Sequence, residues 1–407
     1  MSVRSFKLTM IFVWILFACN QGTGNTGRIL PVKQYKNGEV VRIPFELYED
    51  WIFIKVSING SKPLNYIFDT GVNVMTVDEK TAEGLGLIHK GNSQLSGSIQ
   101  QTGISFSTAP NVAIGSITLD SVIVVTQSHE HISVFYDRDI HGFIGYDLLA
   151  GRIIRIDYEN NVLEVLPAFK PPEGSYVTGL TFINDIPMIS GLAVICNGDT
   201  AGLRLIFDTG ASVSLVCSSP FTGKYHLTET CSNRYESPAL GPTAVGKIYV
   251  TRFPELNVAN HSFSDIPVSL NTSSSGLLSW DAHDGLLGNE ILKRFNLIID
   301  RNSKLVCMTP NSLMNEDFKI HCSGLFIKYE DLTRKCIIVH AVVEGSPADE
   351  SGLLPGDELL KINGRKCSEM RISEIKALLR KDGEKVILCI KRQDILIDML
   401  LKLKEII

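Results

Sequence analysis

The sequence Phe68-Asp69-Thr70-Gly71 returns as Phe207-Asp208-Thr209-Gly210, 139 residues further along the chain. A second landmark, Gly142-Phe143-Ile144-Gly145, returns as Gly285-Leu286-Leu287-Gly288 after 143 residues. An Ile-Asp pair begins eleven residues beyond the last glycine of each copy. Three landmarks in the same order and at nearly equal spacing indicate an internal repeat of about 140 residues.

Short apolar runs around each Asp-Thr-Gly favour strands, and turn signals such as Asn59-Gly60 separate them. The expected strands are residues 52–58, 65–68 and 74–77 in the first copy and 191–196, 204–207 and 213–216 in the second. Residues 148–151 and 290–295 allow only a helical turn or two. Each copy is therefore predicted to be a mostly β lobe of roughly 130 residues.

An Asp-Thr-Gly motif that occurs twice has a chemical rationale. Glycine permits a sharp turn at the end of a strand, so that the carboxylate before it can point into a cleft. Two pseudo-symmetric lobes would bring Asp69 and Asp208 together, and two carboxylates in contact share a proton. One can then take a proton from a water molecule while the other donates one to a carbonyl oxygen.

These doubled motifs resemble the aspartic proteases of the retropepsin and pepsin type over about residues 40–310. The resemblance implies a mostly β, bilobal fold with pseudo-two-fold symmetry, in which two retropepsin-like lobes share one chain. It implies that Asp69 and Asp208 are the catalytic dyad. The residues implied to support the dyad, by interlocking the loops or lying close to substrate, are Thr70, Gly71, Thr209 and Gly210. No metal or other cofactor is expected.

The residues that follow the motif depart from the pepsin pattern. Pepsin-like enzymes usually carry Ser or Thr where this chain has Val72 and Ala211. Loss of these hydroxyl donors removes one stabiliser of the ionised carboxylate. We therefore expect a working pH that need not be strongly acidic.

Two glycine-containing stretches, residues 96–103 and 237–247, are candidates for mobile hairpins over the cleft, one in each lobe. Ordinary surface turns have the same composition, so both interpretations stay open.

The composition excludes several classes of function. The 407 residues contain 39 Lys plus Arg against 44 Asp plus Glu, so there is no basic excess and we expect no nucleic acid as a partner. Nine cysteines include no C-x-x-C pair, and the histidines show no metal-ligand spacing, so no metal site is expected. The sequence also lacks the G-x-x-x-x-G-K-[ST] nucleotide loop.

The first eighteen residues have the pattern of a secretory signal. Arg4 and Lys7 precede an apolar run over residues 8–18, which ends at Cys19. This end resembles the lipobox of bacterial lipoproteins, which implies cleavage before Cys19 and its lipidation. No Asp follows Cys19, so the expected location is the cell envelope, on the outer membrane facing the periplasm, with surface display as the alternative. An ordinary signal peptide or an uncleaved anchor remains an alternative to the lipoprotein.

After residue 310 the repeat ends and a different pattern begins. Residues 344–364 contain a small helix signal, a Gly-Asp turn and an Asn-Gly hairpin. They resemble the α+β PDZ domains attached to bacterial periplasmic proteases, over roughly residues 320–407. The resemblance implies peptide binding by strand addition, with a carboxylate-binding loop around Gly324, Leu325 and Phe326. The PDZ ligand is unknown, and a fold kept only for packing or dimerisation is the alternative.

Two further segments complete the expected C-terminal domain. Residues 372–379 have helical periodicity, with an apolar face formed by Ile372, Ile375, Leu378 and Leu379. Residues 395–403 are almost continuously apolar, which fits either a strand or a helix.

Eight cysteines follow Cys19, and an oxidising periplasm would permit disulfides. Cys217 and Cys231 are the pair that we expect to be bonded. Cys196, Cys307 and Cys389 lie in apolar stretches, where a buried free thiol is the simpler interpretation.

The predicted domains are a signal peptide (1–18), a lipid-anchored tether (19–40), a first lobe (41–170), a second lobe (175–310) and a PDZ domain (320–407). The predicted function is that of a membrane-anchored aspartic endopeptidase acting on a peptide or protein substrate. A catalytically silent lipoprotein that binds extended peptides is the alternative. Activation by a partner, or by removal of a segment near residues 20–45, also stays open.

Overall fold

The computed structural model describes residues 17–18, 32–34, 39–96, 101–145, 152–240, 245–318 and 321–407. Strands dominate these residues, which confirms the mostly β prediction. Cys19 and the helical turn expected at residues 148–151 lie outside the described residues. Within those ranges no helix is long and apolar enough to cross a membrane.

The first repeat contributes two sheets. One has the order β13 (Gly142–Gly145), β6 (Leu64–Asp69), β5 (Trp51–Ile58), β10 (Val112–Ile114), β11 (Ile117–Leu119) and β2 (Val32–Gln34), with β4 (Glu46–Tyr48) paired to β5. The other has the order β1 (Phe17–Ala18), β8 (Ile88–Ser96), β9 (Gln101–Ala109), β12 (Val122–Gln127) and β7 (Thr76–Asp78). β6 and β13 are parallel, so the first Asp-Thr-Gly leaves its strand beside the first Gly-x-x-Gly.

The second repeat forms a single sheet, in which the strand before Asp-Thr-Gly again pairs with the strand of the Gly-x-x-Gly element. Its order is β17 (Thr181–Ile183), β18 (Ile186–Val194), β19 (Thr200–Phe207), β24 (Gly285–Leu287), β20 (Leu215–Cys217), β23 (His261–Asn271), β22 (Val245–Val258) and β21 (Arg234–Leu240). β19 and β24 are parallel, with Phe207 opposite Leu287, so the second motif also lies beside its Gly-x-x-Gly.

A further sheet joins the two repeats. Its order is β16 (Tyr176–Gly179), β26 (Leu305–Pro310), β25 (Phe295–Asp300), β14 (Ile153–Asp157), β15 (Val162–Leu166) and β3 (Val41–Pro44). The two Ile-Asp landmarks meet in the antiparallel pair β14–β25, where Ile156 is opposite Leu297 and Ile154 is opposite Ile299. The strands that close the two repeats therefore hold them together.

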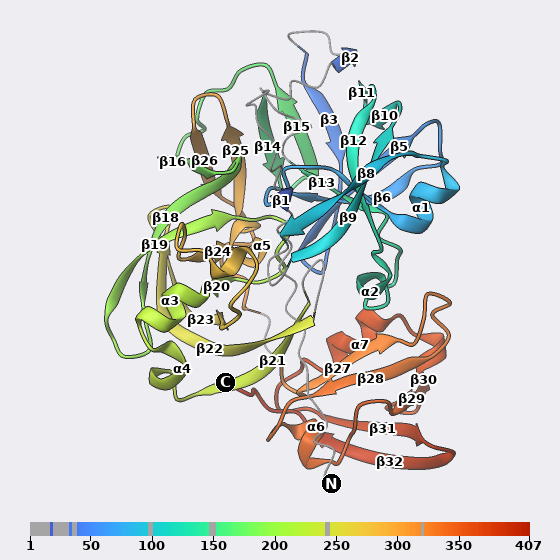
Figure 1. Cartoon of the computed structure of the whole chain (residues 1–407). Helices are drawn as coiled ribbons and strands as arrows, with labels where there is room; N and C mark the ends of the chain where they lie inside the picture. The colour runs from blue at the N-terminus through green and yellow to red at the C-terminus, as the bar shows by residue number, and fades with distance from the viewer. Residues whose placement is uncertain are drawn as a thin grey trace.

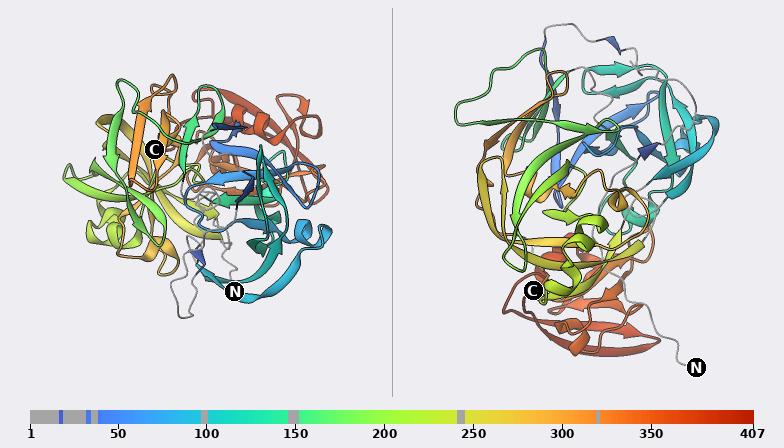
Figure 2. Two further views of the ribbon diagram at one scale, coloured as in Figure 1. Left: turned by 90° about the horizontal axis from the view of Figure 1, so that it is seen from above. Right: turned by 60° about the vertical axis from the view of Figure 1, so that its left-hand side comes forward.

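The C-terminal domain forms its own sheet, drawn in orange and red below the repeats in Figure 1. The order is β27 (Leu325–Tyr329), β28 (Ile337–Val342), β29 (Glu358–Ile362), β31 (Lys385–Arg392) and β32 (Ile395–Lys402), with β30 (Arg365–Lys366) paired to β29. Residues 395–402 are thus a strand. The right-hand view of Figure 2 shows the same stacking of this domain beneath the repeats.

The helices of the described residues are short. They are α1 (Glu79–Gly84), α2 (Glu130–Ser133), α3 (Ser219–Lys224), α4 (Leu227–Thr230), α5 (Asn289–Leu292), α6 (Pro347–Glu350) and α7 (Ile372–Leu378), with 3-10 turns η2 (Leu277–Ser279) and η3 (Cys367–Glu369). Along α7, Ile372 and Ile375 are buried in the core of the C-terminal domain, as the periodicity predicted.

The arms of both candidate hairpins are strands. β8 pairs with β9 and β21 pairs with β22, each pair antiparallel. Residues 97–100 and 241–244, at the two tips, lie outside the described residues. The structure therefore identifies two long hairpins at the expected positions.

The expected disulfide is wrong. Cys196 is bonded to Cys231, with their Cα atoms 5.2 Å apart, whereas Cys217 is a buried free thiol. Cys217 ends β20 inside the sheet. Cys196 Sγ lies 3.6 Å from Arg252 O of β22, and Cys231 O accepts from Arg234, which is opposite Thr251 of the same strand. Cys196 is consequently not the free thiol that its apolar surroundings suggested, while Cys307 is buried and free and Cys389 is half-buried and free.

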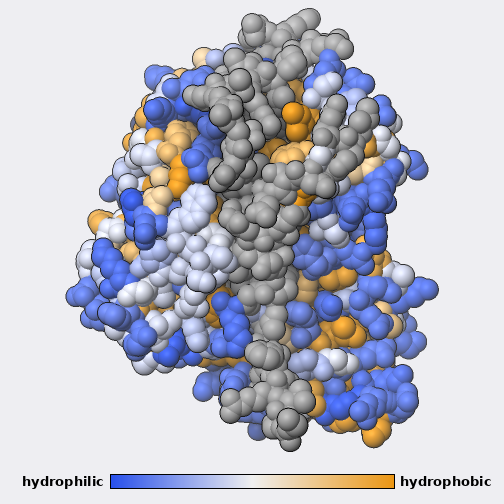
Figure 3. Space-filling model, viewed as in Figure 1, coloured by the Kyte–Doolittle hydropathy of each residue, from blue (hydrophilic) through white to orange (hydrophobic). Residues whose placement is uncertain are grey.

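The outer face of the C-terminal sheet is apolar in part. Orange patches appear along the lower edge of the molecule in Figure 3, where β31 and β32 lie. The exposed large apolar side chains of these two strands are Ile387, Ile395, Leu396 and Leu400.

Candidate active site

The two Asp-Thr-Gly loops meet at the ends of β6 and β19. Thr70 N donates to Thr209 Oγ1, and Thr209 N donates to Thr70 Oγ1, each at 3.0 Å. The hydroxyls also reach the opposite strand, since Thr70 Oγ1 donates to Phe207 O at 2.6 Å and Thr209 Oγ1 donates to Phe68 O at 3.2 Å. These reciprocal bonds hold the two loops as one unit.

Asp69 and Asp208 are fully buried where the loops meet. Gly71 N donates to Asp69 Oδ1 at 2.7 Å, and Gly210 N donates to Asp208 Oδ1 at 2.8 Å. The Oδ2 atom of each carboxyl has no hydrogen-bond partner among the described residues, and a proton held between the two would satisfy both. No cluster of three or more side chains suited to a metal ion occurs in the part of the chain that the structure describes.

The pKa values of the two carboxyls are both raised. Burial, followed by the charge of Asp208, raises the pKa of Asp69 well above its ordinary range. Burial raises the pKa of Asp208 to about 7, although the neighbouring Asp69 carboxyl and the N–H of Gly210, which donates to Oδ1, act to lower it. The pair can therefore hold a single proton up to near-neutral pH.

Glycine is required where the loops approach each other. A Cβ atom at Gly210 would overlap the Asp69 carboxyl group, and one at Gly71 would lie 3.1 Å from Asp208 Cγ. Any larger residue at position 210 would push the two carboxyls apart.

The Gly-x-x-Gly elements pack directly beneath the Asp-Thr-Gly loops. In the second repeat, Gly288 N donates to Ser214 O at 2.9 Å, and Asn289 N donates to Ala211 O at 2.7 Å. A Cβ atom at Gly288 would overlap Val213 O. In the first repeat a Cβ atom at Gly145 would overlap Val72 O in the same way.

The turn between β4 and β5 also holds the second loop, a role that no motif indicated. Ser212 Oγ donates to Glu49 O at 2.5 Å, and Trp51 Nε1 donates to Gly210 O at 2.8 Å. Asn289 Nδ2 donates to Asp50 O at 2.6 Å. Trp51 and Gly210 are 159 positions apart, so no local pattern in the sequence could have linked them.

The loop expected to bind a peptide carboxylate faces the second repeat. Gly324 has a φ of 68°, and its carbonyl accepts from Val343 N at 2.9 Å. Leu325 packs in the core of the C-terminal domain, whereas Phe326 packs in a cluster that includes Tyr235 of β21. Both side chains are buried, so their apolar surfaces are already in contact with protein.

A segment of the first repeat, residues 134–137, lies between β27 and α7. Tyr329 N of the edge strand β27 donates to Val134 O at 2.8 Å, and Lys376 Nζ of α7 donates to Phe135 O at 2.8 Å. Asp137 Oδ1 accepts from Ile372 N at 2.8 Å, at the start of α7. An edge strand and a neighbouring helix are the elements between which PDZ domains bind peptides, so this segment occupies part of that position.

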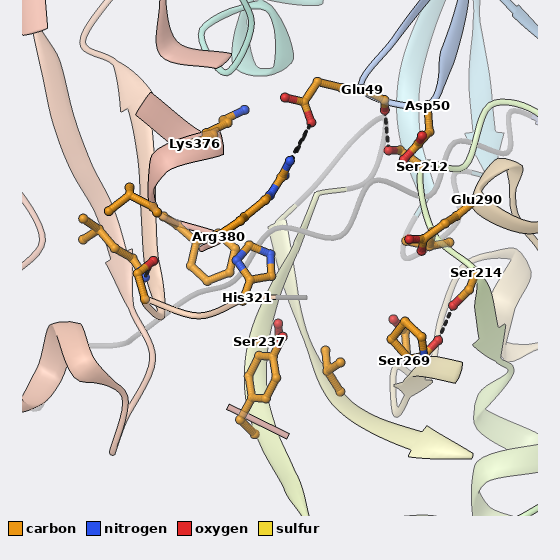
Figure 4. A pocket seen from close by; sticks show the side chains of 18 of the residues that line it. Glu49, Asp50, Ser212, Ser214, Ser237, Ser269, Glu290, His321, Lys376 and Arg380 are labelled. Atoms are coloured by element: carbon orange, nitrogen blue, oxygen red, sulfur yellow. Dashed lines mark hydrogen bonds and ion pairs between the residues drawn. The ribbon is translucent and has the colours of Figure 1, made fainter. Parts of the chain in front are cut away.

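A cavity of about 150 Å³ lies between the C-terminal domain and the second Asp-Thr-Gly loop. Figure 4 shows Arg380 and His321 on one side and Ser212 and Glu49 on the other. Arg380 forms an ion pair with Glu49 at 3.4 Å across it. Its lining includes residues 212–214 of that loop but neither Asp69 nor Asp208, so the cavity lies beside these two carboxyls.

Comparison with known proteins identifies two domains. Residues 54–148 match the family model for aspartyl proteases, a range that includes Asp69, and residues 338–392 match the model for PDZ domains. The chain thus carries an aspartyl protease domain and a C-terminal PDZ domain, which confirms both resemblances. It is also 37% identical over 79 residues to the carboxy-terminal processing protease CtpA of Bacillus subtilis, a match that spans 19% of this chain and 17% of that protein.

Proposed function

We propose that this protein is an aspartic endopeptidase in which Asp69 and Asp208 form the catalytic dyad. The observation that carries the proposal is the meeting of two interlocked Asp-Thr-Gly loops that bury both carboxyls together. The aspartyl protease domain supports the same class of chemistry.

The proposed reaction needs one proton on the dyad. The ionised carboxylate takes a proton from a water molecule as the water oxygen bonds to the peptide carbonyl carbon. The protonated carboxyl donates to the carbonyl oxygen, which gives a neutral gem-diol. One diol proton then returns to the second carboxylate, the first passes its proton to the amine nitrogen, and the C–N bond breaks. The dyad ends with the single proton with which it began.

The edge of the first hairpin supports an extended peptide as the substrate. Phe17–Ala18 pairs antiparallel with β8, with Phe17 opposite Ser96, so this edge accepts an extended segment. Peptides commonly bind by such main-chain pairing. Asp69 and Asp208 are both fully buried, so a substrate can reach them only if neighbouring parts of the protein move.

Cleavage of an unbiased peptide library by the full-length protein, from about pH 3 to about pH 8, tests this function. We expect Asp69→Asn and Asp208→Asn each to abolish every cleavage seen with the unaltered protein. Folded protein that cuts nothing over this range, but still binds library peptides, would support the catalytically silent peptide-binding lipoprotein instead.

We also propose lipid anchoring at Cys19, with the outer membrane facing the periplasm as the location. The apolar run that ends at this cysteine supports the proposal. Cells that express the protein and are fed a labelled fatty acid should label it, and Cys19→Ala should remove the label. Labelling that persists in the variant would contradict the assignment.

A further inference from the structure

Residues 134–137 of the first repeat present three successive backbone carbonyls to the C-terminal domain. Val134 O accepts from Tyr329 N at 2.8 Å, Phe135 O accepts from Lys376 Nζ at 2.8 Å, and Tyr136 O accepts from Arg334 Nε at 3.0 Å. Main-chain hydrogen bonds supply affinity when the edge of a sheet binds an extended peptide, whatever the sequence of that peptide. The C-terminal domain therefore holds this segment as it would hold a bound peptide.

Two side chains of the segment add selectivity to these backbone contacts. The Asp137 carboxylate accepts from Tyr329 OH at 2.8 Å and from the hydroxyl of Ser373. The ring of Phe135 lies edge-on to that of His340 in β28, with centroids 5.1 Å apart. A peptide with an aromatic residue two positions before a carboxylate can make the same contacts, so the groove between β27 and α7 fits such a peptide.

The other side of the segment contacts the first repeat and, through it, the second Asp-Thr-Gly loop. The ring of Tyr136 lies 4.7 Å from that of Trp51, and Trp51 Nε1 donates to Gly210 O at 2.8 Å. Asp137 also accepts from Tyr48 OH at 2.7 Å. The segment thus connects the C-terminal domain to the core that supports the loop of Asp208.

The C-terminal domain also holds the second hairpin, β21 and β22. Arg252 of β22 pairs with Glu405 at 3.3 Å, and its Nε donates to Ile407 O at 3.1 Å. Phe326 packs in one apolar cluster with Tyr235 of β21. The docked domain therefore bridges a segment of the first repeat and a hairpin of the second.

We propose that residues 134–137 are an internal ligand of the C-terminal domain, and that a peptide of another protein displaces them and thereby activates cleavage. The activating peptide carries an aromatic residue two positions before a carboxylate. Displacement frees the domain, together with the hairpin that it holds, from the first repeat. Asp69 and Asp208 are fully buried, so this movement gives a substrate access to them. The activation rests on the proposed function, whereas the displacement does not.

Competition between the internal ligand and the peptide has a measurable consequence. A ligand that binds only the undocked state loses apparent affinity in proportion to the fraction of molecules that are docked. A change that weakens the internal ligand must therefore tighten the binding of the peptide. A docking contact outside the peptide-binding groove would not have this effect.

The first test measures the affinity of the full chain for a labelled peptide with the sequence of residues 132–139, blocked at both ends. An Asp208→Asn background keeps the peptide from being cut. We expect Asp137→Ala in the protein to tighten binding about tenfold, because the peptide brings its own aspartate to Tyr329 and Ser373. Tyr48→Phe keeps the ring and removes one hydrogen bond to Asp137, so it should tighten binding by about threefold without opening a cavity.

Glu130→Ala is the matched control, because it removes an acidic side chain of the same region that pairs with Lys80 instead. This variant should bind the peptide as the unaltered protein does. Addition of Ser373→Ala to Asp137→Ala should weaken binding again, which would place the peptide in the groove and not beside Asp69. Equal affinity in all these proteins, or binding to none of them, would overturn the proposal.

Variants of the peptide test its chemistry. The Asp137→Asn peptide should bind the Asp137→Ala protein about tenfold more weakly than the original, and equal binding would overturn the role of the carboxylate. The Asp137→Asn peptide cut after this position has a free carboxyl terminus. Recovery of affinity would support a chain terminus as the source of the carboxylate, and failure to recover would support an acidic side chain.

Amide hydrogen exchange separates the displacement from the proposed function. With saturating peptide, we expect exchange to rise at residues 134–136, since a short helical turn is marginal once its neighbours are lost. Tyr329 N should stay protected, because the peptide takes the place of Val134 O. Exchange that rises at Tyr329 as well would show a domain that has come loose with its groove empty, and would overturn the proposal.

Cleavage tests the activation. In a protein with both aspartates intact, saturating peptide should raise kcat/KM for a separate substrate by about fivefold or more. Asp137→Ala alone should have the raised value and should not respond further. Cleavage that the peptide leaves unchanged would overturn the activation. If the protein cuts nothing, the proposed function and the activation fail together, and the affinities and the exchange still decide whether residues 134–137 are an internal ligand.

Discussion

Two residues set the pH at which the proposed reaction can run, because the dyad works only while it holds one proton. Burial raises the pKa of Asp69 and raises that of Asp208 to about 7, while Val72 and Ala211 offer no side-chain hydroxyl. We expect kcat/KM, measured from about pH 3 to about pH 9, to peak between weakly acidic and neutral pH. A maximum well below about pH 4 would contradict this expectation.

The same burial predicts a cost in stability at Asp208. Its pKa rises from 3.8 in the unfolded chain to about 7 in the folded one, so the free energy of unfolding falls as the pH rises between these values and stays low above them. Asp208→Asn removes the charge. We expect the variant to be more stable by on the order of 2 kcal/mol at about pH 8, with little difference at about pH 4.

Urea unfolding at both pH values checks this prediction. Asp284→Asn is a suitable comparison, since the pKa of Asp284 is lowered and its carboxylate pairs with Arg204, so that loss of its charge should destabilise the protein at about pH 8. A stabilisation by Asp208→Asn of equal size at both pH values would mean that the charge is not its cause.

At the scale of strands and helices, the features predicted correctly from the sequence depend on residues close together in the chain. The strands before each Asp-Thr-Gly follow from short apolar runs, and the Asn363-Gly364 hairpin follows from a local turn signal with φ values of 48° and 81°. The disulfide depends on distant strands, because Cys196 and Cys231 approach each other only when β18 pairs with β22. The contact between Trp51 and Gly210 could not be predicted for the same reason, because the two residues meet only after both repeats have folded.

The Gly-x-x-Gly element gives a prediction at this scale. Gly288 begins the turn into α5, and a Cβ atom there would overlap the backbone oxygen of Val213. Backbone atoms cannot move aside as a flexible side chain can, so we expect Gly288→Ala to destabilise the protein by about 3 kcal/mol or more and to abolish activity.

Gly179→Ala is the matched control, because no atom lies within 4 Å of its added Cβ. We expect this variant to unfold within about 1 kcal/mol of the unaltered protein. Equal losses in the two variants, measured by urea unfolding, would show that the close approach at Gly288 is not what matters.

At the scale of the whole molecule, Asp137 connects the first repeat to the C-terminal domain. Its carboxylate accepts from Tyr48 OH at 2.7 Å on one side, and from Tyr329 OH and Ile372 N, both at 2.8 Å, on the other. Burial acts to raise the pKa of Asp137, but hydrogen bonds led by that from Ser373 outweigh it and lower the pKa. The contact therefore persists down to acidic pH and weakens only when this carboxyl is protonated.

Asp137→Ala should release the C-terminal domain from the first repeat, because it leaves several donors at the start of α7 without their shared acceptor. Release would expose Tyr329 N, which donates to Val134 O in the docked state. We expect amide hydrogen exchange to increase at least tenfold along β27 and α7, with little change along β31 and β32, which lie on the far side of the domain.

Asp139→Ala removes an ion pair with Arg334 in which the aspartate side chain is 54% exposed, so it should leave exchange in β27 nearly unchanged. The two variants differ by two positions in one segment and remove the same kind of group. If both raised exchange equally, the docking would depend on net charge; if neither did, the apolar contacts around Phe326 would suffice to hold the domain. Only a selective effect of Asp137→Ala is consistent with residues 134–137 acting as the segment that occupies the edge of β27.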